Sequence, residues 1–422
     1  MGTRSQERTH AGRGASIFYG WYVVGACFII CFVVYGICVN TFTVYVKPLE
    51  AEFGWSRKVI SAGVSVAALS AALAAPAVGR LIDRLGVRHV MVVGTLLAGG
   101  ALVLLRWMHS LPAYYAIFVL SGVGQAASTL IPISVVVANW FEVKRGLALG
   151  IVMSGTGLGA MVMVPVTTLI VTRWGWRTSF LSMGLLIVVS AVPVILLLIH
   201  SRPSDLGLQP DGNEAERSVR APRAVVGLTL AEALRTRAFW LIAAMMFTFA
   251  LVGLGMIVHL MPSLTDLGHS DTTASLLVAV VSAMTVCGKL GIGWFADRWG
   301  ARRAVLFASA LMVGALLLLV VARPVVIAVA FAVVYGFAVG APMVINPTLT
   351  SEDLGLLHFG AIFGALTLIG TVGAALGPVV IGALYDAFQS YVPAYLVFAG
   401  LVSVAGLCGF QAYPTAASSS RG

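Results

Sequence analysis

Long runs of apolar residues alternate with short polar segments along nearly the whole chain. Runs of roughly 20 residues, the length that a helix needs to cross a bilayer, can be placed twelve times in the 422-residue sequence. We place them at 19–46, 57–79, 90–108, 112–138, 146–171, 177–199, 238–262, 272–296, 304–322, 325–348, 360–384 and 391–412. Since a helix satisfies its backbone hydrogen bonds internally, this pattern predicts an all-α integral membrane protein with twelve transmembrane helices.

The longest polar interruption, residues 201–237, divides these spans into two sets of six. Because six is even, the two halves have parallel topology, as in many secondary transporters. We therefore expect two pseudo-symmetric six-helix bundles, a linker with a short surface helix or a loop over 228–237, and a polar tail at each end. The expected boundaries are 1–18 for the first tail, 19–200 and 238–412 for the bundles, 201–237 for the linker and 413–422 for the last tail.

Both halves carry the same polar motif, Gly-x-x-x-Asp-Arg-x-Gly-x-Arg, between their second and third spans. It begins at Gly79 in the first half and at Gly293 in the second. The same offset relates glycines of the fifth and eleventh spans, namely Gly146, Gly150 and Gly159 to Gly360, Gly364 and Gly373. A shared register over separate landmarks indicates an internal duplication.

The charged residues predict the topology of the chain. With the N-terminus inside, eighteen of the 26 Lys and Arg residues fall in inner segments, seven in outer segments and one, Lys289, within a span. This bias predicts that both termini lie in the cytoplasm. The net charge of +10 is then a topology signal, with membrane lipids rather than nucleic acid as the expected partner.

Composition argues against several classes of function. With 59% hydrophobic and 10% charged residues, the chain is far from the roughly 25% charge of soluble proteins. The five cysteines all fall inside apolar spans, where they are typical packing residues. We find no phosphate-binding loop, paired catalytic carboxylates or His/Cys cluster, so we expect no enzyme, no cofactor and no metal site.

The repeated motif resembles the signature of the major facilitator superfamily. Three shorter matches are similar to the monocarboxylate transporters and their microbial relatives, including oxalate/formate-type exchangers. They are Tyr19-Gly20-Trp21-Tyr22-Val23-Val24, Trp140-Phe141-x-x-Lys144-Arg145-Gly146-Leu147-Ala148-x-Gly150, and Tyr335-Gly336 followed by Gly377-Pro378. The resemblance implies a major facilitator fold that works by alternating access in a bacterial-type plasma membrane.

In such a protein the repeated motif implies a charge latch that helps to hold the two bundles in one orientation. The alternative is a simple positively charged inner loop, which does not explain why the acid and the glycines repeat. The expected latch residues are Gly79, Asp83, Arg84, Gly86 and Arg88 in the first half and Gly293, Asp297, Arg298, Gly300 and Arg302 in the second.

Lys289 is the main candidate for chemistry in the membrane. An ionisable side chain at membrane depth normally faces the bundle interior or a cavity, and Ser282, Thr285 and Lys289 form a polar stripe at helical spacing. The resemblance places Lys289 at the family's substrate-binding arginine, so a carboxylate anion is the expected partner. The alternative, a lysine that snorkels to the surface, requires a reach of about 12 Å to the level of Asp297.

The resemblance leaves the coupling mechanism open. Where the animal transporters carry an aspartate and a lysine implicated in proton coupling, this chain has Thr285 and Asn40. Proton symport, exchange and uniport therefore all stay open. His259 is a candidate for coupling to H⁺, with an interface hydrogen bond as the alternative.

Further polar residues are candidates for substrate contact or for hydrogen bonds between helices. They are Tyr335 and Asn346 in the tenth span, Gln125 and Thr129 in the fourth, and Asn40 in the first. We also expect the acidic pair Glu352-Asp353 to be solvated in a loop. Together these features predict a transporter, expected to be monomeric, for a small organic monocarboxylate of the lactate or pyruvate type. An exchanger or efflux carrier for other acids or drugs is the first alternative, and a non-transporting membrane sensor is the second.

Overall fold

The computed structural model describes residues 18–211 and 227–412, which are almost entirely helical. Eleven helices within these residues are long and apolar enough to cross a membrane. One of them, α7 (Arg145–Leu198), covers two predicted spans, because the chain bends at Gly175, where φ is +80°. The expected tails over 1–17 and 413–422, and residues 212–226 of the linker, lie outside the described residues.

The first half is built from eight helical segments, and two of its spans are interrupted. The first span passes through a π-helical stretch and ends at Phe53, beyond the predicted residue 46. The fourth span is broken at Thr129, whose φ of −116° and ψ of −109° are not helical. The segments are α1 (Gly20–Ile30), η1 (Cys31–Asn40), α2 (Phe42–Phe53), α3 (Arg57–Leu85), α4 (Val87–Leu105), α5 (Leu111–Ser128), α6 (Leu130–Trp140) and α7.

The second half follows the same plan. Its fourth span is again divided, here at Gly340 and Ala341. The segments are α9 (Arg237–Asp266), α10 (Asp271–Trp299), α11 (Ala301–Val320), α12 (Val325–Val339), α13 (Pro342–Leu354), α14 (Phe359–Phe388) and α15 (Val392–Gln411). Between the halves lie η2 (Pro203–Leu206) and the four-residue helix α8 (Leu230–Ala233), so a short helix does form within 228–237.

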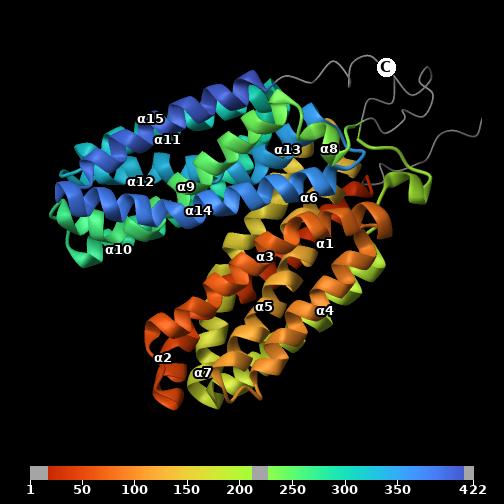
Figure 1. Ribbon diagram of the computed structural model, residues 1–422, viewed down its shortest axis with the longest axis horizontal. Coiled ribbons are helices and arrows are strands. Elements are labelled where there is room, and N and C mark those ends of the chain that lie inside the picture. The colour runs from red at the N-terminus through yellow and green to blue at the C-terminus, as the bar shows by residue number, and fades with distance from the viewer. Residues whose placement is uncertain (1–17, 212–226, 413–422) are drawn as a thin grey trace, which may run out of the picture.

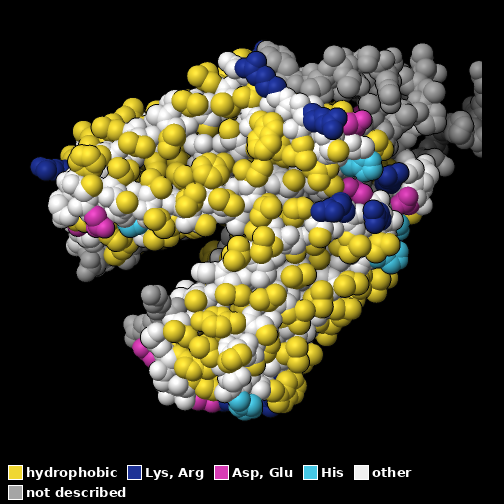
Figure 2. Space-filling model, in the orientation of Figure 1, with side chains coloured by type: hydrophobic (Ala, Val, Ile, Leu, Met, Phe, Trp, Pro, Cys, Tyr) yellow, Lys and Arg dark blue, Asp and Glu magenta, His cyan; other side chains and the backbone are white. Residues whose placement is uncertain are grey.

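The two halves form two bundles arranged as a V (Figure 1). The bundles touch through α7 against α10 and α3 against α14. They meet near α6, α8 and α13 and separate toward α2 and α10 (Figure 1). We call the closed side the motif end, because both repeated motifs lie there, and the other side the open end. The space-filling view shows a cleft between the bundles that faces the open end (Figure 2).

Both ends of the linker are attached at the motif end. Asp211 accepts hydrogen bonds from the backbone N–H groups of Val143 (3.1 Å) and Lys144 (2.9 Å), just before α7. Leu228 donates its backbone N–H to Leu354 at the end of α13 (3.1 Å). The linker therefore touches the loop that precedes α7 in one bundle and the end of α13 in the other.

Candidate functional site

Lys289 lies on α10 at the interface between the bundles, with only 4% of its surface exposed. Its ammonium donates hydrogen bonds to the carbonyl of Met153 (3.0 Å) and the hydroxyl of Thr156 (2.7 Å), both on α7. Within residues 18–211 and 227–412 no carboxylate pairs with it. Lys289 is therefore a buried cation with polar but uncharged partners.

The helix turn that carries Lys289 is held between glycines of two other helices. A Cβ on Gly150 of α7 would overlap the carbonyl oxygen of Lys289. A Cβ on Gly340, at the break after α12, would lie 2.5 Å from the carbonyl of Thr285 and 2.7 Å from the amide nitrogen of Lys289. The helices approach so closely at both contacts that no side chain fits there, and this packing fixes the backbone of the Lys289 turn relative to α7.

Asn40 is connected to Lys289 through a shared hydrogen-bond partner, Thr156. Its side-chain amide, at the end of η1, donates to the carbonyl of Thr156 at 3.5 Å. Thr285 lies one turn before Lys289 on α10, and its hydroxyl donates to the carbonyl of Val281 (2.8 Å). Both residues are neutral, so neither supplies the charge that the ammonium lacks.

Tyr335 is buried and Asn346 is half-buried within the second bundle. Tyr335 is fully buried, stacks on Phe331 at 5.3 Å between ring centroids, and has a hydroxyl without a hydrogen-bond partner among the described residues. The side-chain oxygen of Asn346 is also buried without such a partner. Buried polar atoms of this kind are rare and call for a ligand, a water molecule or a second conformation.

Gln125 and Thr129 lie together at the break between α5 and α6. The Gln125 amide donates to the Ser121 hydroxyl (3.2 Å), and the Thr129 hydroxyl donates to the Gln125 carbonyl (2.7 Å). These bonds satisfy a carbonyl close to the point where the helix is interrupted. They connect neither residue to Lys289.

His259 lies far along α9 from the motif end, within the second bundle. Its ring nitrogens lie 3.3 Å from the hydroxyl of Tyr391 and 3.1 Å from the carbonyl of Pro378 on α14. Both nitrogens thus have partners that tie three helices together. This geometry supports the alternative of an interface hydrogen bond more than a role in coupling.

The two motif carboxylates each cap a helix of the opposite bundle. Asp297 of α10 accepts hydrogen bonds from the backbone N–H groups of Gly146 (2.5 Å) and Leu147 (2.7 Å) at the start of α7. Asp83 of α3 accepts from the N–H of Ala361 (3.3 Å) at the start of α14. A carboxylate at a helix N-terminus satisfies free N–H groups and interacts favourably with the helix dipole. Both acids therefore bond across the bundle interface at the motif end.

Glycine is required at the motif positions for two separate structural reasons. A Cβ on Gly79 would overlap the Gly360 carbonyl, and one on Gly293 would overlap the Gly146 carbonyl. Gly86 and Gly300 end α3 and α10 with φ of +82° and +90°, a conformation that other residues rarely adopt.

The motif arginines differ from one another in their surroundings. Arg84 and Arg298 are exposed, whereas Arg88 bonds to the carbonyl of Leu196. Arg302 forms an ion pair with Asp353 and donates to the carbonyl of Ala412 (2.7 Å). The expectation of a solvated Asp353 is therefore wrong, because α13 extends to Leu354 and leaves the Asp353 side chain with no exposed surface.

Arg145 is a contact between bundles that the sequence patterns did not assign. This residue is 8% exposed and donates to Ser351 of α13 (2.6 Å), as well as to the carbonyls of Phe141 (2.9 Å) and Ala138 (3.1 Å). It stands in the Trp140–Gly150 segment that resembles the monocarboxylate transporters. Like Asp83 and Asp297, this buried arginine bonds across the bundle interface at the motif end.

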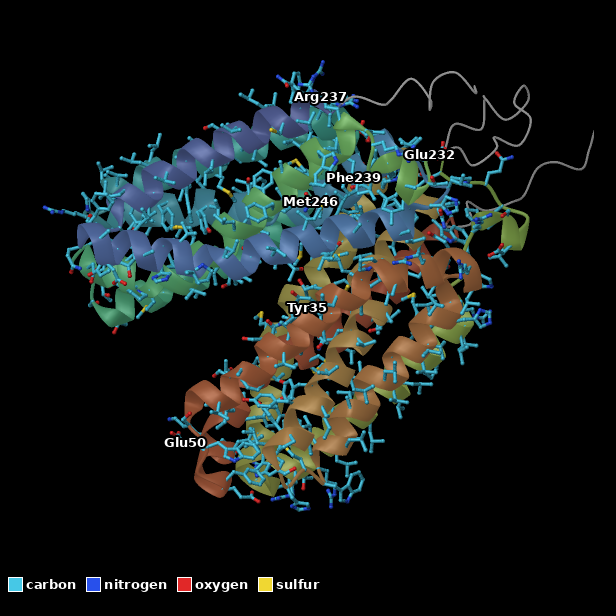
Figure 3. All side chains as sticks on the ribbon, in the orientation of Figure 1. Tyr35, Glu50, Glu232, Arg237, Phe239 and Met246 are labelled. Carbon is cyan, nitrogen blue, oxygen red and sulfur yellow. The ribbon has the colours of Figure 1, made fainter. Side chains whose placement is uncertain are left out.

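Tyr35 is a further residue near the bundle interface that was not predicted. It lies on η1, close to where the bundles meet, whereas Glu50 lies at the open end (Figure 3). Tyr35 is neither fully buried nor fully exposed.

Among the residues that the structure describes, no group of three or more His, Cys, Asp or Glu side chains could hold a metal ion.

Comparison with known proteins identifies the family. The family model for the Major Facilitator Superfamily matches residues 28–355 and 247–421. The chain is 28% identical to monocarboxylate transporter 3 of Rattus norvegicus over 397 residues, which cover 92% of this chain and 79% of that protein. It is 24% identical to the uncharacterized MFS-type transporter YcxA of Bacillus subtilis (strain 168) over 393 residues, which cover 88% of this chain and 90% of that one.

The solved structures agree with this family. The E. coli fucose:proton symporter FucP, in its outward conformation, superposes with a TM-score of 0.73 at 13% identity. The superposition covers 93% of this chain and 100% of the FucP chain. This likeness confirms the predicted all-helical fold. The chain belongs to the major facilitator superfamily and is a multi-pass membrane protein and secondary transporter rather than an enzyme.

Proposed function

We propose that this transporter carries small organic monocarboxylates by alternating access, with Lys289 as the residue that binds the carboxylate. The main support is the buried ammonium without an anionic partner among the described residues. A charged group at membrane depth is costly unless an opposite charge compensates it. An ammonium has three donors, and protein groups occupy two of them. One carboxylate supplies both a charge and an acceptor, and one cation suits a monoanion better than a dianion.

The orientation in the membrane is part of this proposal. Lys, Arg, Asp, Glu and His side chains gather at the motif end, and the flanks of both bundles are largely hydrophobic (Figure 2). With the positive-inside rule, this distribution supports a cytoplasmic motif end with both termini inside. The proposal also takes a bacterial-type plasma membrane as the location and a monomer as the working unit. The cleft then opens to the outside, and its substrate enters from there.

The structure does not favour one coupling mode over another, because Thr285 and Asn40 are neutral and both His259 nitrogens have structural partners. A buried cation at Lys289 is equally compatible with exchange or efflux of other organic acids. The experiment must therefore vary the acid and the pH gradient together.

Transport by purified protein in proteoliposomes tests the proposal. A panel of labelled mono- and dicarboxylates is presented with and without a pH gradient to the wild type, Lys289→Gln, Lys289→Arg and Lys47→Gln. Hydrogen bonds to a charged group contribute about 1.5–3 kcal/mol, so we expect Lys289→Gln to reduce monocarboxylate uptake by roughly 10- to 100-fold. Lys289→Arg should retain part of the uptake, because the charge remains.

Lys47→Gln is the matched control, since Lys47 is exposed on α2 and the variant should transport like the wild type. Wild-type uptake of dicarboxylates alone, or full uptake by Lys289→Gln, contradicts the proposal. The response of uptake to the gradient separates proton symport from exchange.

A further inference from the structure

In this conformation the ammonium of Lys289 bonds across the bundle interface instead of facing the cleft. Lys289 belongs to the second bundle, and both of its partners, Met153 and Thr156, belong to the first. If the motif end opens, α7 and α10 separate and these two bonds are lost. The two bonds therefore exist only while the motif end is closed.

Thr156 is the centre of this contact. Its hydroxyl donates to the Met153 carbonyl (2.8 Å) and accepts from the Lys289 ammonium (2.7 Å). Its carbonyl accepts from Asn40 of η1 (3.5 Å). One residue of α7 thus connects α10 of the opposite bundle with η1 of its own bundle.

The duplicated interface provides an internal comparison. At the offset that relates the two motifs, Lys289 corresponds to Ala75 and Thr156 to Gly370, so the α3–α14 contact has neither group. The backbone packing is nevertheless the same, because a Cβ on Gly364 would overlap the Ala75 carbonyl, just as one on Gly150 would overlap that of Lys289. Close packing at this place therefore does not need the lysine, and the polar cross-link is an addition to one of the two interfaces.

We infer that the Lys289–Thr156–Met153 contact holds the empty carrier closed at the motif end. The substrate carboxylate forms an ion pair with the ammonium, which replaces the bonds to Met153 and Thr156 and allows the motif end to open. This inference rests on the proposed function. Without an anion, opening leaves a cation inside the protein with neither its α7 partners nor a counter-charge, which is unfavourable. With a bound carboxylate, the pair is neutral and the bundles can separate. Thr156 is a positioning residue in this scheme.

A direct consequence concerns the mode of transport. If the empty carrier reorients slowly and the loaded carrier quickly, the protein exchanges one acid for another faster than it moves acid in one direction only. Exchange should therefore exceed net efflux from preloaded proteoliposomes. Weakening the cross-link should speed the return of the empty carrier and reduce this difference.

The variants are chosen to separate gating from binding. Thr156→Val removes the hydroxyl and nearly keeps the shape, Thr156→Ser keeps the hydroxyl, and Thr168→Val is a control on the same helix, because the Thr168 hydroxyl is exposed and bonds to Val164 (2.9 Å). We expect Thr156→Val to lower the ratio of exchange to net efflux by about tenfold, the size expected for one hydrogen bond to a charged group. Thr156→Ser and Thr168→Val should keep the wild-type ratio.

A second readout needs no substrate. Spin labels at His89 of the first bundle and Arg237 of the second, both exposed at the motif end, report its opening in a cysteine-free background that still transports. Without any acid, Thr156→Val and Lys289→Met should both populate longer distances than the wild type. Unchanged distances together with an unchanged ratio overturn the inference.

The two readouts distinguish the possible failures. If the wild type moves no monocarboxylate, the proposed function fails while the substrate-free distances still test the cross-link. If monocarboxylates move but Thr156→Val leaves the distances unchanged, the cross-link is not a gate and the binding role of Lys289 stands.

Discussion

At the scale of single residues, the ion pair between Arg302 and Asp353 makes a testable contribution to stability. The Asp353 side chain has no exposed surface and that of Arg302 is 26% exposed. Removing one partner of a buried pair leaves the other uncompensated. Breaking a buried pair costs about 3–5 kcal/mol, and because Arg302 is partly exposed we expect Asp353→Ala to lower the free energy of unfolding by an amount toward the lower end of that range, measured by chemical or thermal unfolding in detergent.

The duplicated position supplies the control for this prediction. Asn139 corresponds to Asp353 and is neutral, with an amide that donates to the Ser201 carbonyl (3.0 Å). Asn139→Ala should cost only about 1 kcal/mol, the value of one ordinary hydrogen bond. Replacement of Arg302 and Asp353 together by leucine should recover much of the loss, because apolar residues can replace a buried pair. Equal losses in Asp353→Ala and Asn139→Ala would contradict the importance of the charge.

The same residues mark how far the sequence predicts the site. Lys289 could be singled out because a cation within an apolar span is anomalous by itself. Its partner Thr156 could not, since a threonine in a helix is ordinary and this one belongs to the other bundle. Asp353 was placed wrongly for the same reason, because its partner Arg302 lies in the first turn of α11, a different helix. Long-range pairing has no signature in local sequence.

At the scale of elements, glycine contacts set how closely α7 and α10 can pack. A Cβ on Gly150 would overlap the Lys289 carbonyl, whereas one on Gly314 of α11 would meet nothing within 4 Å. We expect Gly150→Val to force the two helices apart and open the motif end, seen as longer distances between labels at His89 and Arg237. Gly314→Val is the control and should leave the distances unchanged. If the motif end stays closed in Gly150→Val, the contact accommodates the larger side chain and Gly150 does not set the distance between α7 and α10.

The positions of the elements follow from the sequence better than their interruptions do. Every predicted span lies for most of its length on helices, because an apolar run of membrane length has few other solutions. The π-helical stretch η1 and the break at Thr129 were not predicted. η1 contains Gly36, which packs against the backbone of Gly159, and Pro132 follows the break at Thr129 and has no N–H to donate. Glycine and proline also occur inside regular membrane helices, so neither residue marks an interruption by itself.

At the scale of the whole molecule, the bundles meet at the motif end through two related interfaces with unequal hydrogen bonds. The offset between the halves correctly relates the two motifs and the helices they touch. Which end of the carrier is closed does not follow from the sequence, because alternating access uses the same residues in both states. The inequality comes from the groups around each carboxylate. Asp297 has two backbone bonds of 2.5 and 2.7 Å, whereas Asp83 has one of 3.3 Å and the His358 ring nitrogen at 3.9 Å.

This inequality predicts different effects of the same substitution in the two halves. Asp297→Asn should open the motif end more than Asp83→Asn, because it weakens two charge-assisted bonds at a helix N-terminus instead of one. Interaction of a carboxylate with a helix N-terminus is worth about 0.3–2 kcal/mol, so the population of the open state should rise by roughly 2- to 30-fold for Asp297→Asn and less for Asp83→Asn. Distances between labels at His89 and Arg237 measure both populations. Equal shifts would mean that the interfaces act as one unit and that the extra bonds of Asp297, together with the nearby Lys289 contact, do not bias the carrier.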